Sequence, residues 1–345
     1  MPTTRRLDGL DAARGLAVVS MLVAHLSPVG GVLDVSEYLT APLFAVIIGI
    51  SMGVRLTERR PAPGTFLLDN AQRGLILVLL GVLLQAIYSQ IDVVLPYLGV
   101  LIIVLAPLAL VLHRTPVLTV GLAAALAVVG PIVVERAREA YPSMVASWPR
   151  WSLDLVTWLA TGEHYRLVSF LPTALGGLAL GTVLRRAVAP PEGYVIGAAM
   201  LVLGLVAYAL GNGTADGSAA YSGTTAEVVG ATFLATATVV ASFLVVDLLT
   251  GSGAARALGP LLATGRLALT AYTLQILWLA LLAALRDNAS DDAWWILGTT
   301  LVVVVGLCWG FDRRWGTGPL EWVVHRLRPQ PPPRGRHLSG APGRE

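Results

Sequence analysis

The stretch LDGLDAARGLAVVSMLVAHL, residues 7–26, is an apolar run of span length that carries charged side chains inside it. Such side chains are rare within membrane spans and usually mark a function or a paired site. Arg14 and His25 are eleven positions apart, about three helical turns, so they share one helix face and lie about 16 Å apart along its axis. That separation excludes a direct hydrogen bond between them. The segment therefore predicts a first span with a cation near one end and an acid–base group near the other.

The rest of the chain has the composition of a polytopic membrane protein. Its 345 residues are 55% hydrophobic and 13% charged, with a mean hydropathy of +0.72, whereas soluble domains average about 25% charged residues. The net charge of +3 comes from arginine, because the chain has no lysine. A basic excess of this kind is typical of cytosolic loops, and no nucleic-acid-binding motif accompanies it. Cys308 is the single cysteine, so we expect no disulfide within the chain, no cysteine-based zinc site and no metal.

Hydropathy predicts an all-α, polytopic helix bundle with ten transmembrane helices, or eleven if 150–160 is a short span instead of an interfacial helix. The predicted spans are 9–28, 38–56, 71–90, 93–112, 116–134, 166–184, 193–210, 227–249, 261–284 and 293–311. With the N-terminus in the cytosol, 19 arginines fall on the cytosolic side and 5 on the outer side, as the positive-inside rule requires. We therefore expect cytosolic N- and C-termini in a bacterial-type cytoplasmic membrane.

The first span is expected to be retained, because acidic residues enter its apolar run and no cleavage site follows. Residues 1–328 are predicted to form a single bundle, and the proline-rich, basic residues 329–345 a disordered cytosolic tail. Gly49, Ser51 and Gly53 in the second span predict close helix packing. A bundle rich in small residues can also form a homodimer.

Several polar residues at the cytosolic ends of the spans form a candidate anion site. Asp11 can pair with Arg14 at a spacing of three residues, and capping of the helix is the simpler alternative for the acids of the first turns. An arginine two turns inside a span needs a carboxylate, backbone carbonyls or a bound anion. Arg266 is a second candidate phosphate contact in the ninth predicted span, where Tyr272 and Gln275 add polar groups to an apolar helix. We expect these residues to bind a cytosolic cofactor that bears phosphates.

The outer ends of the spans hold candidate catalytic residues. His25 suits a catalytic base because its reference pKa is near neutrality, although a lone histidine near an interface is often a buried, satisfied side chain. Asp92, in QIDVVLPYLGVL, either orients a substrate hydroxyl or the His25 ring, or is a plain interfacial cap.

The predicted outer connection of about 135–165 is longer than the others, and long loops are usually functional or disordered. It holds Trp151, Trp158, Glu163 and His164, which we predict to bind an acceptor. An interfacial tryptophan belt is the alternative reading of the two indole rings.

Four islands of sequence resemble transmembrane acyltransferases. RRLDGLDAARGLAVVSMLVAH, residues 5–25, resembles the opening of the heparan-α-glucosaminide N-acetyltransferase family and of the bacterial family of acyltransferase-3 type, in which an arginine and a histidine separated by ten residues form the hallmark. APLFAVIIGISMGVRL, residues 41–56, looks like the second span of the heparan-type proteins. TGRLALTAYTLQ, residues 264–275, and GPLEWVVHRL, residues 318–327, resemble C-terminal motifs of the YeiB-like bacterial branch.

The resemblance implies an integral-membrane acyltransferase. Acetyl-CoA, or another acyl-CoA, would bind from the cytosol as co-substrate, and its acyl group would pass to a hydroxyl or amine of an extracytoplasmic glycan or glycolipid. His25 would be the catalytic base, which activates the acceptor or relays the acyl group. Arg14 and Arg266 would contact the CoA.

Two alternatives compete with this interpretation. Buried charges could instead form the path of a secondary transporter or of a lipid or glycolipid flippase. The chain could also be a non-catalytic subunit that presents a glycolipid to partners. No P-loop, GxSxG, HExxH or Rossmann fingerprint is found in a suitable setting, which removes support for ATP-driven transport and soluble hydrolase chemistry.

Overall fold

The computed structural model describes residues 7–28, 35–87, 89, 91–189, 191–211, 219–252, 254–287 and 290–327. These residues form helices and connections without a strand, so the all-α prediction is confirmed. Within them, ten helices are long and apolar enough to cross a membrane. The predicted tail 329–345 lies outside the described residues, and the cytosolic location of the termini stays a prediction.

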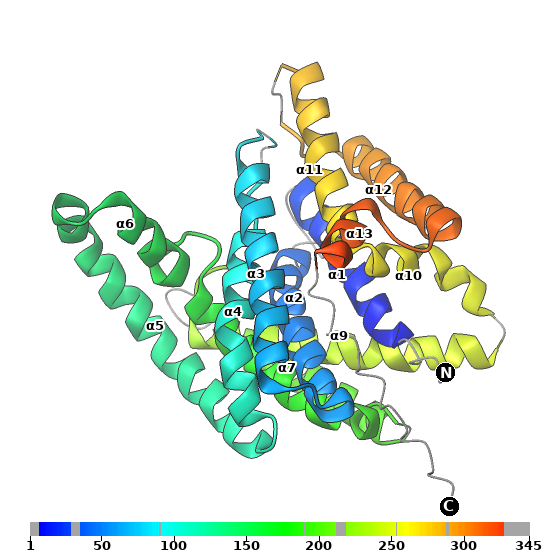
Figure 1. Ribbon diagram of the computed structural model, residues 1–345, viewed down its shortest axis with the longest axis horizontal. Helices are drawn as coiled ribbons and strands as arrows, with labels where there is room; N and C mark the ends of the chain where they lie inside the picture. Colours follow the sequence, from blue (N-terminus) through cyan, green and yellow to red (C-terminus); the bar gives the residue numbers. More distant parts are fainter. Residues whose placement is uncertain are drawn as a thin grey trace, which may run out of the picture.

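The ten long helices overlap the ten predicted spans. They are α1 (Asp8–Leu26), α2 (Val35–Val54), α3 (Pro63–Gln85), α4 (Leu95–Leu112), α5 (Pro116–Ser147), α7 (Leu167–Ala187), α8 (Glu192–Gly211), α9 (Thr225–Gly251), α11 (Ala268–Leu285) and α12 (Trp294–Trp315). The short ones are α6 (Arg150–Val156), α10 (Gly259–Arg266) and α13 (Pro319–Arg326), with π-helical turns at Arg55–Arg59 and Thr157–Thr161 and a 3₁₀ turn at Ala254–Leu258. Figure 1 shows how they are arranged.

The prediction of a long outer connection at about 135–165 is wrong, because most of these residues are helical. Helix α5 continues through it to Ser147, and α6 and a π-helical turn follow. The extension is rich in good helix formers and has an ion pair between Arg136 and Glu139, three residues apart at 2.9 Å. At seven residues, α6 is too short to be an eleventh span.

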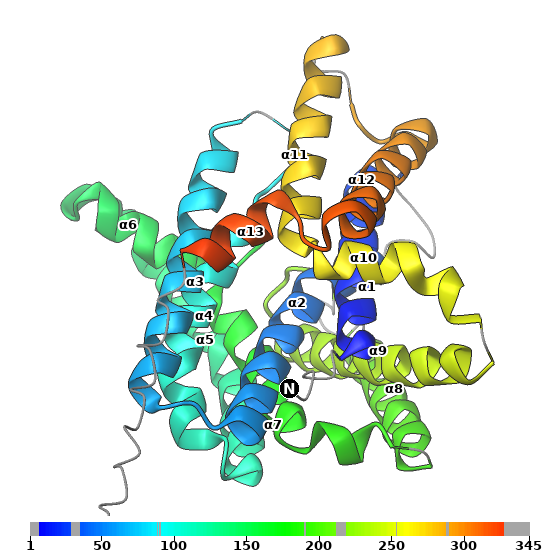
Figure 2. The ribbon, with the colours of Figure 1, turned by 45° about the vertical axis from the view of Figure 1, so that its right-hand side comes forward.

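The third and ninth predicted spans also differ from the structure. Helix α3 begins at Pro63 instead of 71, because a proline is well suited to the first helical turn. The ninth span is divided at Leu267 into α10 and α11. In Figures 1 and 2, α10 runs across the foot of α11 instead of continuing it. Hydropathy predicts a single span here, because apolar residues lie on both sides of Thr264, Gly265 and Arg266.

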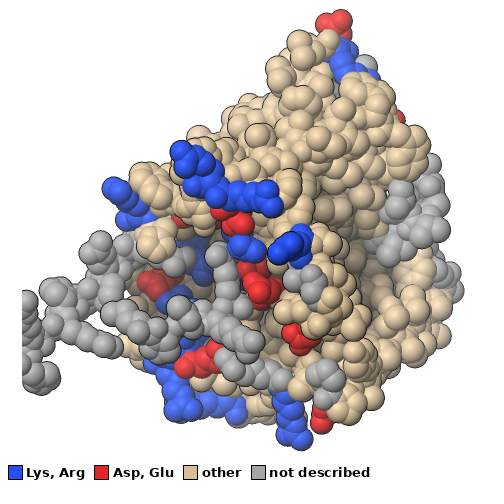
Figure 3. Space-filling view, turned by 90° about the vertical axis from the view of Figure 1, so that its right-hand side faces the viewer, with Lys and Arg blue, Asp and Glu red and all other residues tan. Residues whose placement is uncertain are grey.

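Close packing of α2 on α7 confirms the role expected for Gly49 and Gly53, whereas Ser51 lies at the cavity described below. A Cβ added at Gly49 would lie 1.9 Å from the carbonyl oxygen of Ala174, and one at Gly53 would lie 2.7 Å from that of Leu178. Large apolar side chains of α3, α5 and α8 are instead exposed, as expected for helices that face lipid. On the face shown in Figure 3, charged residues gather over one part and leave a wide area almost without them.

Candidate functional site

A cavity of about 330 Å³ lies where α1, α2, α3, α4, α10, α11 and α13 converge. Its polar lining residues are Arg14, Ser51, Arg55, Asn70, Arg73, Arg266, Tyr272 and Glu321, and its remaining walls are mostly apolar, including Phe44, Ile48, Leu77, Leu98, Ile102 and Leu269. Ligand pockets typically combine apolar walls with a few placed polar groups, and this volume is at the low end of their range. Four guanidinium groups on an apolar wall favour an amphiphilic anion.

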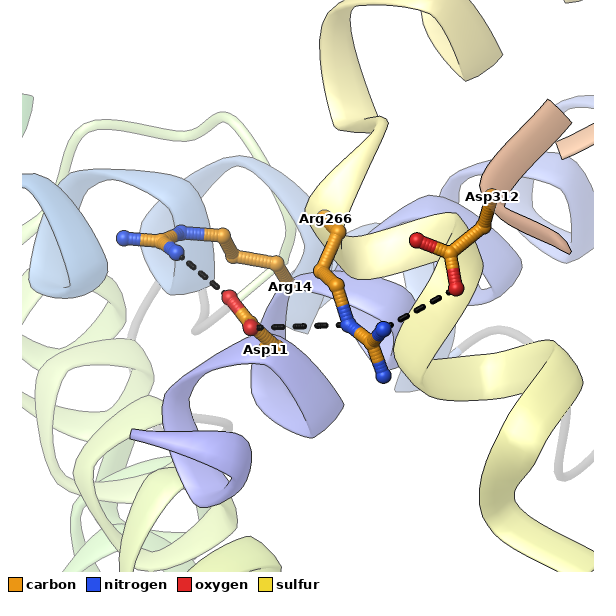
Figure 4. A network of polar contacts seen from close by, with 4 residues as sticks. All are labelled: Asp11, Arg14, Arg266 and Asp312. Carbon is orange, nitrogen blue, oxygen red and sulfur yellow. Dashed lines mark hydrogen bonds and ion pairs between the residues drawn. The ribbon is translucent and has the colours of Figure 1, made fainter. Parts of the chain in front are cut away.

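An ionic network on one side of the cavity holds two of these arginines (Figure 4). Arg14 Nη1 donates to Asp11 Oδ1 at 2.8 Å, and its Nη2 donates to Ser51 Oγ at 3.0 Å. Arg266 Nε lies 3.9 Å from the second carboxylate oxygen of Asp11, and its Nη1 donates to Asp312 at 2.9 Å. Asp11 is buried and lies between the two guanidinium groups. The predicted pairing of Asp11 with Arg14 is therefore present.

Glycines bring the backbones of α1 and α10 together and so create this network. A Cβ added at Gly265 would lie 1.7 Å from the carbonyl oxygen of Asp11, and one at Gly15 would lie 2.3 Å from that of Leu261. Atoms cannot approach so closely, so only glycine fits at either position. The break after Arg266 then directs α11 away while the arginine stays at the cavity.

Helix α13 closes one end of the cavity. The Glu321 carboxylate accepts hydrogen bonds from the Leu269 and Thr270 N–H groups at 2.9 and 3.0 Å and from the Thr270 hydroxyl. These donors belong to the first turn of α11, where a negative charge also interacts favourably with the helix dipole. The Gln72 side chain on α3 donates to the Leu327 carbonyl, so the helix is tied to both walls.

Tyr272 lines the cavity and also lies near Asp92, which is predicted at the outer end of the spans. Its buried side chain lines the cavity, and its hydroxyl accepts a hydrogen bond from the Val94 N–H at 3.1 Å. Asp92 and Tyr221 lie near enough to interact electrostatically with this hydroxyl. Gln275, one turn further along α11, is 0% exposed but is not among the cavity-lining residues, and neither of its buried amide atoms has a hydrogen-bond partner among the described residues.

Asp92 and His164, both predicted at the outer ends of the spans, form an acid–base pair near His25, and these three residues are called the outer cluster. Asp92 Oδ2 lies 2.6 Å from Nδ1 of His164, with side chains 63% and 44% exposed. His25 at the end of α1 interacts electrostatically with both. The structure thus brings together three of the predicted residues, but Asp92 pairs with His164 and not with His25.

Aromatic side chains surround this cluster. The rings of Tyr97 and Trp158 lie 6.2 Å apart, and those of Tyr97 and Tyr165 lie 5.5 Å apart. Burial raises the pKa of the Tyr165 hydroxyl well above its usual value, so it stays neutral. Tyr221 completes the group, 5.6 Å from Tyr165 and 5.4 Å from His164.

Two predicted acceptor residues have other surroundings. Trp151 is 71% exposed on α6 and makes no aromatic contact within the described part of the chain. Glu163 is exposed and lines a second cavity of about 280 Å³ with Arg138 and Tyr141 of α5. Among the described residues, no group of three or more His, Cys, Asp or Glu side chains could hold a metal ion.

Sequence reasoning did not identify two of the four cavity arginines, Arg55 and Arg73. Arg55 forms an ion pair with Asp69 on α3. The available signal was the cluster of Asp69, Asn70 and Arg73, whose spacing places Asp69 and Arg73 one helical turn apart once α3 is extended back to Pro63.

The comparisons with known proteins cover the C-terminal part of the chain. Residues 183–328 match a family described as "Protein of unknown function (DUF418)". This is a YeiB-like membrane family, which supports that branch of the resemblance, while the arginine–histidine spacing on α1 lies outside the match. The matched range contains Arg266, Tyr272 and Glu321 of the cavity. No curated protein matches the chain.

Proposed function

We propose that this protein is an integral-membrane acyltransferase, which moves an acetyl or other short acyl group from cytosolic acyl-CoA to a hydroxyl or amine of an extracytoplasmic glycan or glycolipid. The observation that carries the proposal is the course of α1. This helix contributes Arg14 to the four-arginine cavity and, about 16 Å further along its axis, places His25 beside the Asp92–His164 pair.

The chemistry of CoA fits the two ends of α1. Its phosphates are anions that guanidinium groups bind well, whereas its pantetheine arm is thin and long. A cavity of about 330 Å³ could hold only part of such a molecule. We assign the phosphate-bearing part to Arg14, Arg55, Arg73 and Arg266, and the direction of the arm to Tyr272, which lies between the cavity and the outer cluster.

The outer cluster supports acid–base chemistry on an acceptor. His25 is the proposed catalytic base, which activates the acceptor or relays the acyl group. Trp158 with Tyr97 offers an aromatic surface for a sugar ring of the acceptor. Glycans and glycolipids at the membrane surface are therefore the proposed partners, and no metal is required for the transfer.

A transporter or flippase is the second candidate function. The observation that favours it is the break between α10 and α11 beside the network of Asp11, Arg14, Arg266 and Asp312, because transporters often bind substrates at discontinuous helices. This candidate predicts movement of a substrate across the membrane without any change to it.

Transfer of labelled acetyl groups distinguishes the two. Purified protein receives labelled acetyl-CoA and a cell-envelope glycolipid extract, and the wild type is compared with His25→Ala. The acyltransferase predicts label on a glycolipid in the wild-type reaction and a rate at least about a hundredfold lower in the variant. Equal labelling in both would refute the role of His25, and absence of CoA binding would favour the transporter.

A further inference from the structure

The strongest observation beyond the proposed function is the contact between His164 and Asp92. Nδ1 of the imidazole lies 2.6 Å from the carboxylate oxygen, which is a charge-assisted hydrogen-bond distance. A ring that donates from Nδ1 to a carboxylate keeps its lone pair on Nε2, and that nitrogen can accept a proton. A carboxylate, an imidazole and an accessible second nitrogen form the arrangement by which general bases are held and activated.

The ring of His164 is held from several sides. It meets Tyr221 edge to face at a centroid distance of 5.4 Å and an interplanar angle of 87°, and it lies 6.3 Å from the ring of Tyr165. Rigid surroundings of this kind allow a base to act without reorganisation.

Arg166 fixes the two segments that carry these rings. Its side chain is 2% exposed and donates to four backbone carbonyls, those of Gly162, Glu163, Tyr221 and Ser222. A buried arginine that donates to carbonyls of residues 162–163 and 221–222 joins the segments before α7 and before α9. His164 and Tyr221 therefore keep their relative positions.

The two histidines differ in access. His164 is 44% exposed and Asp92 is 63% exposed, so an acceptor that arrives from outside the bundle can reach this pair. His25 lies in the last turn of α1, on the helix that also lines the cavity with Arg14. His164 is exposed and His25 is only partly so, which makes His164 the histidine that such an acceptor reaches more readily.

We propose that His164 takes the proton from the acceptor hydroxyl or amine, and that Asp92 is the positioning residue that holds its ring. This inference rests on the proposed acyl transfer and assigns the activation of the acceptor to His164 instead of His25, which keeps the role of a relay. The acceptor oxygen or nitrogen forms a bond to the acyl carbon as its proton moves to Nε2 of His164, and the carbon–sulfur bond of the thioester breaks. The leaving thiolate receives this proton, which His25 relays from His164, so that the products are the acylated acceptor and the CoA thiol and both imidazoles end neutral, as they began.

The test compares label transfer and CoA affinity in four proteins: the wild type, His164→Ala, Asp92→Asn and Asp154→Asn. Asp154 is an exposed carboxylate on α6 outside the cluster, so its variant is the matched control. We expect the rate to fall about 10²- to 10⁴-fold in His164→Ala and at least about tenfold in Asp92→Asn. The Kd for CoA should be unchanged in both, and the control should behave as the wild type.

The split between kcat and KM separates positioning from a structural role. Asp92 holds the ring that takes the proton and does not itself bind the acceptor, so Asp92→Asn should lower kcat and leave the KM for the acceptor unchanged. A merely structural role would also disturb the neighbouring rings of Tyr165 and Tyr221 and change both constants.

The outcomes are distinct. This inference would be overturned, and the acyltransferase left standing, if His164→Ala transferred label as fast as the wild type or if Asp92→Asn changed the KM for the acceptor together with kcat. A wild-type protein that binds CoA but labels no acceptor would overturn the proposed function and the inference together.

Discussion

Loss of Arg14 should weaken the binding of CoA by an amount that the contacts of the cavity allow us to estimate. A ligand at 100 times its Kd stabilises the folded protein by about 2.7 kcal/mol. One charge-assisted hydrogen bond contributes about 1.5–3 kcal/mol, so Arg14→Ala should raise the Kd about 10- to 150-fold. At the same ligand concentration the stabilisation should then fall to about 0.3–1.3 kcal/mol.

The assay is the shift of thermal unfolding on addition of CoA, measured as the difference between liganded and free protein. This difference matters because Arg14 also pairs with Asp11, and its loss lowers the stability of the free protein as well. Arg114→Ala is the matched control, since Arg114 is exposed beyond α4 and does not line the cavity. A full shift in Arg14→Ala, or an equal loss of the shift in Arg114→Ala, would refute the assignment of the cavity.

Three further predictions concern packing, the closing helix and the acceptor surface. Gly265→Ala places a methyl group 1.7 Å from a backbone oxygen of α1 and should destabilise the protein by about 1–3 kcal/mol or more in thermal unfolding. The control is Gly298→Ala, whose methyl group meets no atom within 4 Å and which should be neutral or stabilising by up to about 1 kcal/mol. Glu321→Gln removes the charged acceptor that holds α13 to the first turn of α11, so limited proteolysis at the end of α13 should be about tenfold faster. An unchanged proteolysis rate would contradict the role of this carboxylate in holding α13 at the cavity. Trp158→Ala should raise the KM for the acceptor and Trp151→Ala should not, because only the first ring joins the aromatic cluster; equal effects in steady-state kinetics would contradict this.

Hydropathy was sufficient to predict the helices because each span carries its own apolar signal. All ten predicted spans overlap long helices, and the one predicted at 166–184, with Pro172 inside it, is the helix α7. The signal is local, however, and could not reveal the break at Leu267. Gly265, two residues before the break, packs closely against α1, which is a tertiary interaction that hydropathy does not report.

The cavity was predicted only in part for the same reason. Asp11 and Arg14 are three residues apart, so their pairing follows from helix geometry. The partners that come from other helices, Arg73 and Glu321, could not be assigned, because hydropathy does not say which helix faces are adjacent.

The outer cluster shows the same limit in the choice of partners. Asp92 was expected near His25, and the two do interact. The closest partner of Asp92 is nevertheless His164, which the sequence places 72 positions away, on the far side of α4 and α5. The residue types were sufficient to nominate both side chains, and only the fold could pair them.

The proposed acyltransferase passes an acyl group from CoA on one side of the membrane to an acceptor on the other. The most direct measurement uses the protein in sealed vesicles, with labelled acetyl-CoA added only on the side of Arg14 and a glycolipid acceptor accessible only on the side of His25. We expect label on the acceptor with the wild type, and at least about a hundredfold less with His25→Ala. Label that stays on the side of the CoA, or an acceptor that crosses the membrane without being acylated, would contradict the proposed function.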